Sequence, residues 1–346
     1  MTTAAPGPRA GHPYHMHDAI YAQPGALRLV GRGNQPAISA SAAALRKASH
    51  VVLAGSGSSW HAALIAAMQL ARAGRLGARV RPAMAAELTD YGAPPDSGAA
   101  TVGITHRGTP SVTASLAAAR AAGATTIAVT SKASPVAADH VLHTVDAEAS
   151  GTHTVSYTTA LAALTLLAAA TGDDDELARA LDALPDQLAF LLGQESWEQL
   201  AERFDARRHY WFVGGGPNHA TALEGALKLT EAAGLPAVGL DAEQFLHGPW
   251  SGVAREDLVV VLAPAGAARS RCLHAARVAR GRGADVLALG AEDDRELAGL
   301  AAETIALPPV AELVSPIAAV LPLQLLAYHI AVRRGRNPDG QPLPLS

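Results

Sequence analysis

The stretches VVLAGSGSSWHAALIAAMQL (51–70) and WFVGGGPNHATALEGALKL (211–229) decide the fold, because each joins a short apolar run to a glycine-rich turn and a helical pattern. They align with Gly57 opposite Gly216, which stand 159 positions apart. A short apolar run before such a turn is typical of a buried strand that leads into a helix. Each stretch therefore predicts a strand–turn–helix unit.

The repetition continues beyond these two stretches. TVGITHRGTPSVTASLAAARAAGA (101–124) corresponds in kind to LVVVLAPAGAARSRCLHAARVARGRGA (258–284), and each is followed by a further apolar strand pattern. Duplication of one βαβαβ unit explains this order. We expect an α/β protein with two tandem domains, each a parallel sheet with helices on both faces in a flavodoxin-like three-layer αβα arrangement.

The domain boundaries follow from shifts in composition. A Pro- and Gly-rich N-terminal arm covers residues 1–40, contains one short helix candidate at 16–30, and is expected to pack on the first unit. The first domain is predicted at 41–193 and the second, with the C-terminal tail, at 194–346. The polar stretch 171–208 between them begins with an Asp run that can cap a helix.

Charge and cysteine content narrow the function classes. The net charge is −4 without a long basic run, which argues against a nucleic-acid partner. Cys272 is the only cysteine, so an intrachain disulfide is excluded and a reducing, cytoplasmic location is favoured.

Apolar segments give no sign of a membrane partner. Residues 1–18 lack the apolar stretch of a secretory signal. The most apolar segment, 315–332, contains two prolines, a glutamine and a histidine, and is therefore interpreted as a buried helix.

Both glycine turns favour an anion, because backbone N–H groups gather where a helix begins. A dinucleotide site would need a third glycine where Trp60 stands and an acidic residue after the next strand, which ends in Arg and Pro. No cofactor is therefore expected. Gly57, Ser58 and Ser59 instead offer a cradle for one phosphate, although such a serine can also be an ordinary helix cap.

The segment THRGTPSVT (105–113) is a second candidate anion loop at a strand-to-helix turn. It supplies the hydroxyls of Thr105 and Thr109, together with His106 and Arg107. Arg107 can hold phosphate through charge-assisted hydrogen bonds, or it can be a surface residue in a turn.

Acid–base candidates lie in ALEGALKLTE (222–231). Glu224, Lys228 and Glu231 follow at spacings that place them on one helix face among small apolar residues. This stripe either lines a polar cleft or forms an exposed Glu224–Lys228 ion pair.

His247 follows in EQFLHGPWSG (243–252), where Gly248 and Pro249 restrict the backbone and can direct the imidazole. A carboxylate and an imidazole are the groups that sugar ring opening and enolisation require. A nearby lysine can stabilise an enediolate oxygen or form an imine. A structural or surface role for the histidine is the alternative.

The motifs ALEGALKLTE, HGP (247–249) and PLQLLAYHIA (322–331) resemble the double-SIS (sugar isomerase) family in sequence and order. That family includes the isomerase half of glutamine–fructose-6-phosphate aminotransferase, amino-sugar-phosphate deaminases and fructosamine deglycases. The resemblance implies that Glu231 is the enolisation base, Lys228 its partner, and His247 a ring-opening group that reaches a neighbouring subunit. It thus implies a homodimer with a shared active site.

The same resemblance extends to the phosphate loops. Ser59 falls on the phosphate-binding serine of the family, whereas His106 and Arg107 replace a glutamine and a serine, and Pro110 replaces a threonine. Gly216 and Thr154 complete the predicted substrate-binding set.

Two departures from the family shape the expected reaction. No glutaminase domain with a nucleophilic cysteine precedes the motifs, so glutaminase activity is not expected, and the tail 334–346 lacks the family's lysine. We expect deamination or deglycation of an amino-sugar or ketosamine phosphate, or aldose–ketose isomerisation. The alternatives are a non-catalytic SIS regulator that binds a sugar phosphate and a purely structural protein.

His12, His15, His17 and Asp18 have metal-like spacing in HPYHMHD (12–18). They fall where the family has a helical arm without metal, so no metal site is predicted.

Overall fold

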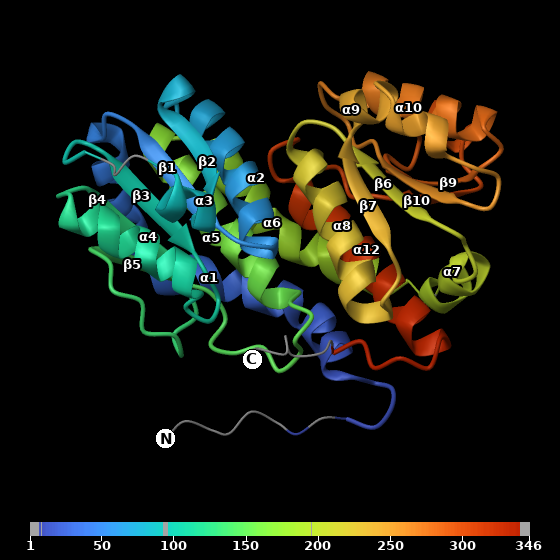
Figure 1. The fold of residues 1–346 in the computed structure, drawn as a ribbon, viewed down its shortest axis with the longest axis horizontal. Helices are drawn as coiled ribbons and strands as arrows, with labels where there is room; N and C mark the ends of the chain where they lie inside the picture. Colours follow the sequence, from blue (N-terminus) through green and yellow to red (C-terminus); the bar gives the residue numbers. More distant parts are fainter. Residues whose placement is uncertain (1–6, 8, 93–95, 195, 340–346) are drawn as a thin grey trace. The chain divides into compact units, whose positions relative to one another are not determined.

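A computed structural model describes residues 7, 9–92, 96–194 and 196–339 (Figure 1). Its strands form two five-stranded parallel sheets. The first has the order β2-β1-β3-β4-β5, with β1 (Val51–Gly55), β2 (Val80–Met84), β3 (Ala100–Ile104), β4 (Thr125–Thr130) and β5 (His140–His143). The second has the order β10-β9-β8-β6-β7, with β6 (Tyr210–Gly214), β7 (Ala237–Asp241), β8 (Leu258–Leu262), β9 (Asp285–Gly290) and β10 (Glu303–Ala306).

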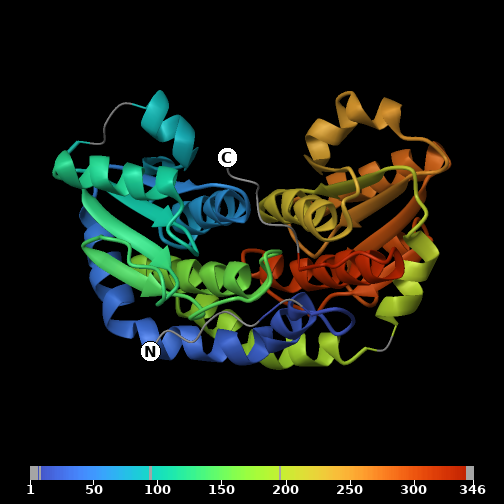
Figure 2. The same ribbon diagram turned by 60° about the horizontal axis from the view of Figure 1, so that its bottom comes forward.

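Helices cover both faces of each sheet, as Figure 2 shows. In the first, α2 (Ser58–Arg72) packs with α5 (Val155–Gly172), and α3 (Ala85–Asp90) packs with α4 (Pro110–Ala121). In the second, α8 (Pro217–Ala233) and α7 (Trp197–Phe204) pack with α12 (Ser315–Arg333), and α9 (Ala242–Leu246) packs with α10 (Arg269–Gly281). The remaining elements are α1 (His15–Lys47), α6 (Asp175–Leu192) and α11 (Arg295–Ala298), with short 3₁₀ turns at Gly77–Arg79 and Pro249–Gly252. The predicted duplicated three-layer fold is confirmed.

The two glycine turns have nearly identical backbone angles. Gly57 has φ 57° and ψ −130°, and Gly216 has φ 56° and ψ −131°. Two residues earlier, a Cβ on Gly55 would lie 2.3 Å from the Ser59 carbonyl oxygen, and one on Gly214 would lie 2.2 Å from that of Asn218. Glycine is required here because the strand end and the helix start approach too closely for any side chain.

The described chain divides into two compact units that do not follow chain order. The unit around the first sheet comprises Gln23–Glu148 and Val155–Asp186. The unit around the second sheet takes Gln187 onward, the short segment Ala149–Thr154, and the N-terminal residues up to Ala22. Those N-terminal residues therefore cluster with the second sheet, and not with the first as expected.

Helix α1 is also longer than the short helix expected at residues 16–30. It runs through Pro24 and Pro36, two residues that normally interrupt a helix because they lack an N–H donor. One face is buried at every third or fourth position, and this packing outweighs the local cost of the prolines. The buried residues are Met16, Ile20, Gln23, Leu27, Val30, Asn34, Ile38, Ser41 and Leu45.

The connection between the repeats is helical, as its composition predicts. Asp174 Oδ1 accepts a hydrogen bond of 2.9 Å from the backbone N–H of Leu177 in the first turn of α6. The acidic run therefore caps this helix.

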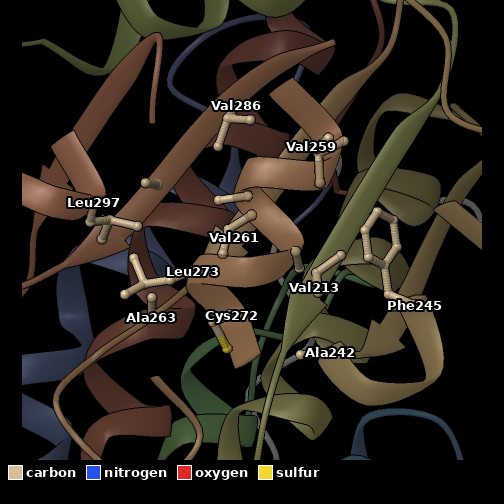
Figure 3. Close-up of a cluster of buried hydrophobic side chains, with 14 of the residues drawn as sticks. Val213, Ala242, Phe245, Val259, Val261, Ala263, Cys272, Leu273, Val286 and Leu297 are labelled. Atoms are coloured by element: carbon tan, nitrogen blue, oxygen red, sulfur yellow. The ribbon is translucent and has the colours of Figure 1, made fainter. Parts of the chain in front are cut away.

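A dense apolar cluster fills the space between the second sheet and helices α9 and α10 (Figure 3). Val213, Val261 and Val286 project from the strands toward Phe245 and Cys272 on the helices. Burial raises the pKa of the Cys272 thiol to about 12. The single cysteine is therefore a protonated core residue, without the thiolate that reactive cysteines need.

Helices α5 and α12 are long and apolar enough to cross a membrane by length and composition alone. In the structure, 89% of the apolar window of α5 and 94% of that of α12 are buried. Core helices of soluble proteins have this character, and the interpretation of 315–332 as a buried helix is confirmed.

Candidate functional site

Helix α8 presents the acid–base candidates at its C-terminal half. Pro217 occupies its first turn, and Gly234 ends it in the left-handed conformation with φ 65°, where the Gly234 N–H donates to the Thr230 carbonyl. These signals fix the helix register and place Glu224, Lys228 and Glu231 on one face.

Lys228 is the centre of a buried polar cluster. Its Nζ donates to Glu231 Oε2 at 2.5 Å and lies 3.4 Å from Glu224 Oε1. It also donates to the carbonyl oxygen of His153 at 3.0 Å. The side chains of Lys228 and Glu224 are both 0% exposed.

This burial contradicts the alternative of an exposed Glu224–Lys228 pair. An ammonium group removed from water needs acceptors and opposite charge around it, and here two carboxylates and one carbonyl provide them. The sequence pattern revealed the shared face, but Glu224 was not placed in the predicted site. Its spacing of four residues from a lysine on an otherwise apolar helix was the available signal.

Glu231 differs from Glu224 in remaining open to solvent. Its side chain is 35% exposed while Oε2 is held by Lys228. A carboxylate with one oxygen fixed and part of its surface open can accept a proton from a bound molecule at a defined position.

The carbonyl of His153 belongs to the short segment Ala149–Thr154, which clusters with the second sheet. Thr154, a predicted substrate-binding residue, is the next residue and is 0% exposed. Thr154 is therefore the chain neighbour of the residue whose carbonyl binds Lys228. Sequence patterns could not identify His153, because its contribution is a backbone oxygen.

His247 ends helix α9 and is exposed, with 70% of its side chain open to solvent. Its Nε2 lies 3.0 Å from Glu243 Oε1, and Glu243 Oε2 lies 3.1 Å from Arg271 Nε. Gly248 follows with φ 136° and ψ −56°, so the chain turns sharply after the imidazole. His247 thus contacts Glu243, whereas Lys228 and Glu231 contact each other.

The first glycine turn lies in the unit of the first sheet. Gly57 and the adjacent Ser56 are exposed, Ser58 and Ser59 are half-buried, and α2 begins at Ser58 without a side-chain cap. The N-cap position itself is occupied by Gly57 and not by a serine. Backbone N–H groups and hydroxyls at a helix start are suited to an oxyanion.

The second candidate loop connects β3 to α4 in the same unit. Thr105 is 1% exposed, and its Oγ1 accepts a 2.8 Å hydrogen bond from the Thr109 N–H and donates to Thr109 Oγ1 at 3.1 Å. The loop is therefore closed by its own threonines. Arg107 is exposed and donates to the Glu148 carbonyl at 3.3 Å, and the His106 carbonyl accepts from Ser131 Oγ at 2.9 Å.

Both loops follow neighbouring strands whose order reverses in the sheet. Strands β1 and β3 are adjacent, with β2 beyond β1 and β4 beyond β3. The carboxyl edge at such a switch point is the usual place for a ligand in a doubly wound sheet. The structure thus places Gly57, Ser58, Ser59 and the loop 105–109 at one edge of the first sheet.

The second glycine turn borders a cavity of about 410 Å³ in the unit of the second sheet. The cavity lies at the carboxyl ends of β6 and β7. Its walls are formed by Gly215, Gly216, Asp241, Ala242, Glu243, Ala268 and Arg271. Gly216 is thus accessible from a hollow, as its predicted role requires.

The histidines of HPYHMHD contact neighbouring aromatic rings and a backbone carbonyl. His12 Nδ1 lies 2.7 Å from the Tyr328 hydroxyl, His15 Nε2 lies 2.9 Å from the Gly7 carbonyl, and the His17 ring stacks on Tyr21 at 4.4 Å between centroids. These contacts anchor the start of α1 within its unit.

Comparison with known proteins gives the family. The family model for the SIS domain matches residues 44–170 and 204–334. A glutamine–fructose-6-phosphate aminotransferase [isomerizing] from Pyrococcus horikoshii is 32% identical over 343 residues, covering 96% of this chain and 57% of that protein. The chain thus spans little more than half the length of this relative.

Solved structures agree in fold. The C-terminal domain of glucosamine-fructose-6-phosphate aminotransferase from Francisella tularensis superposes with a TM-score of 0.83 at 21% identity, covering 96% of this chain and 99% of the other. A tagatose-6-phosphate ketose/aldose isomerase from Escherichia coli gives a TM-score of 0.81 at 20% identity, with 98% and 100% covered. With the SIS model matched twice in succession, the chain belongs to the SIS domain family.

Proposed function

We propose that the chain is an enzyme that processes an amino-sugar or ketosamine phosphate by proton transfer between two adjacent sugar carbons. The observation that carries the proposal is the Lys228–Glu231 contact of 2.5 Å, in which a fully buried ammonium holds a carboxylate that is 35% exposed. The relative from Pyrococcus horikoshii, a fructose-6-phosphate aminotransferase, supports a sugar phosphate as the substrate class.

In this proposal Glu231 removes the proton from the carbon next to a carbonyl or imine, which gives an enediol or enediolamine. The protonated Glu231 then returns that proton to the neighbouring carbon. Lys228 keeps Oε2 in place, so the other carboxylate oxygen moves the proton. Substitution of Glu231 or Lys228 is expected to slow turnover, while the phosphate of the substrate can still be bound.

Three reactions share this step. Aldose–ketose isomerisation needs only the proton shift, whereas deamination and deglycation also require water, which hydrolyses the imine and releases ammonia or an amine.

His247 is proposed to open the sugar ring by moving a proton between the ring oxygen and the anomeric hydroxyl. Its 70% exposure and its place before Gly248 are compatible with action outside its own unit. We propose a homodimer in which His247 serves the neighbouring subunit.

Phosphate binding is proposed for the first glycine turn and the loop 105–109. Ser58 and Ser59 supply hydroxyls beside the start of α2, and Arg107 supplies a charge. The low net charge of the chain makes this local cation important for a dianionic substrate.

Product detection by mass spectrometry tests the proposal. The chain is incubated with glucosamine 6-phosphate, with fructose 6-phosphate and ammonia, and with a fructosamine 6-phosphate. Glu231→Gln is expected to slow turnover at least about 100-fold, the range for loss of a general base. Glu176→Gln, an exposed glutamate in the first turn of α6, is the matched control and keeps full activity.

A second outcome distinguishes the non-catalytic regulator. Stabilisation of the folded chain by a hexose phosphate, with no product from any of the three mixtures, would favour that role and contradict the proposed one.

A further inference from the structure

The C-terminal segment of the described chain ends beside the loop that contacts Lys228. The carboxylate of Asp339 accepts hydrogen bonds from the backbone N–H groups of Met16, at 2.7 Å, and His15, at 3.3 Å. Asp339 thus caps the start of α1. The Asn337 side chain in turn accepts from the Asp339 N–H at 2.9 Å.

The backbone of the same residue holds the loop. The carbonyl oxygen of Asp339 accepts hydrogen bonds from the N–H groups of Gly151, at 2.6 Å, and Thr152, at 3.1 Å. The next residue is His153, whose carbonyl accepts from Lys228 Nζ at 3.0 Å. One residue near the chain end therefore connects α1 to the loop that contacts the buried ammonium.

The segment also passes the end of α8 itself. Gly234, the left-handed residue after that helix, lies against the Arg336 guanidinium, since a Cβ on Gly234 would be 2.1 Å from it. The stretch from Arg336 to Asp339 thus contacts both the helix that carries Lys228 and the loop opposite it. All these residues belong to the unit of the second sheet.

We propose that Asp339 is a positioning residue, which holds the loop 150–153 so that the His153 carbonyl fixes Lys228 and, through it, the Glu231 carboxylate. The inference rests on the proposed role of Glu231. Asp339 contacts no reacting atom in this account. Its carboxylate, bound to the start of α1, fixes the position of its own backbone carbonyl, and that carbonyl accepts the two hydrogen bonds from the loop.

Three variants separate this role from general loosening of the fold. Asp339→Ala removes both acceptors for α1, whereas Asp339→Asn keeps one amide oxygen able to accept from Met16. Asp174→Ala removes a comparable cap, that of α6, without any contact to the loop.

Two measurements do not depend on turnover. The first is amide hydrogen exchange of a peptide covering 149–154. The second is labelling by acetic anhydride, because Lys47, Lys132 and Lys228 are the only lysines of the chain. Lys47 and Lys132 are exposed and serve as internal standards for the buried Lys228.

In Asp339→Ala we expect exchange at Gly151 and Thr152 to quicken at least tenfold and relative labelling of Lys228 to rise several-fold. On a turned-over sugar phosphate, kcat is expected to fall at least tenfold while KM stays within twofold, because phosphate is held elsewhere. Asp339→Asn restores most of each value, and Asp174→Ala changes none of them.

The inference is overturned if Asp339→Ala leaves these amides and Lys228 as protected as in the unaltered chain. It is equally overturned if Asp174→Ala has the same effects, or if kcat is unchanged once the loop is released. A chain that turns over no sugar phosphate contradicts the proposed function, while exchange and labelling still decide whether Asp339 anchors the loop.

Discussion

Lys228 shows how one residue can link stability to chemistry. Its ammonium is fully buried and lies 3.4 Å from Glu224 Oε1 and 2.5 Å from Glu231 Oε2. Removing one member of such a group leaves another buried charge without compensation, which costs far more than loss of a surface pair.

Lys228→Met is therefore expected to lower the free energy of unfolding by about 3–5 kcal/mol, because the buried Glu224 carboxylate loses the ammonium group 3.4 Å away. Adding Glu224→Gln to Lys228→Met should recover most of that loss. Urea unfolding of the single and double variants measures both effects. Equal stability of the single and the double variant would show that Glu224 and Lys228 are not coupled.

At the scale of single residues, the sequence predicts which side chains share a helix face better than it predicts how deeply they are buried. The spacing of Glu224, Lys228 and Glu231 predicts a shared face, and that face exists. Burial of the pair was not predictable from α8 alone, because the segment 149–154 that supplies the third acceptor lies some 75 residues away in the chain.

Among the elements, the strand–turn–helix units are the most strongly specified by sequence. Both repeats place a glycine at the strand end and another at the helix start, and both adopt the same backbone angles. The glycine pattern, repeated after 159 residues, was sufficient to predict the two strand–turn–helix units, while the shared backbone angles come from the structure.

Gly55→Ala and Gly214→Ala are expected to be equally and strongly destabilising, by about 3 kcal/mol or more, because each Cβ meets a carbonyl oxygen of the next helix. Gly57→Ala, where a Cβ meets nothing within 4 Å, should cost only the strain of its positive φ, about 1–2 kcal/mol. Thermal unfolding of the three variants gives the order. A larger loss for Gly57→Ala than for Gly55→Ala would contradict the packing argument.

Helix α1 shows where sequence reasoning at this scale fails. Its two prolines and its glycines indicated a broken arm, yet its buried face recurs every three or four residues from Met16 to Leu45. That periodicity was present in the sequence, but residues such as Gln23, Asn34 and Ser41 interrupt its apolar character. Tertiary packing decides such a helix, and local propensity does not.

At the scale of the whole molecule, the two repeats share one fold but carry different candidate functional residues. The two sheets share one strand order, but the acid–base cluster occurs on α8 and the hydroxyl-rich turn before α2. The composition predicted the α/β class, whereas the division of N-terminal residues between units depends on contacts that no local pattern records.

Stability should depend on pH through His329 in α12. Burial lowers the pKa of this imidazole to about 4 from an ordinary value of 6.5, and its side chain is 7% exposed. Between these values the unfolded chain binds a proton that the folded chain does not, so stability falls as pH drops from 6.5 to 4. The loss can reach about 3 kcal/mol.

His329→Phe removes the titrating group and keeps an aromatic ring, so the fall in stability between pH 7 and pH 4.5 should become smaller by roughly 2 kcal/mol. Urea unfolding midpoints of the unaltered chain and of His329→Phe are measured at the two pH values. His17 is present in both proteins, so its titration does not contribute to the difference between them. An identical pH dependence in the variant would show that His329 is not held neutral.

Proton transfer by Glu231 is tested most directly by ¹H NMR of the three candidate sugar phosphates in D₂O. Glu231 is 35% exposed, so part of the proton that it holds is expected to exchange with D₂O before it is returned to carbon. The unaltered chain is therefore predicted to replace the C1 or C2 proton of its substrate with deuterium, and Glu231→Gln to slow that exchange at least about 100-fold. Glu176→Gln should exchange it at the original rate. Undiminished exchange in Glu231→Gln would contradict the account.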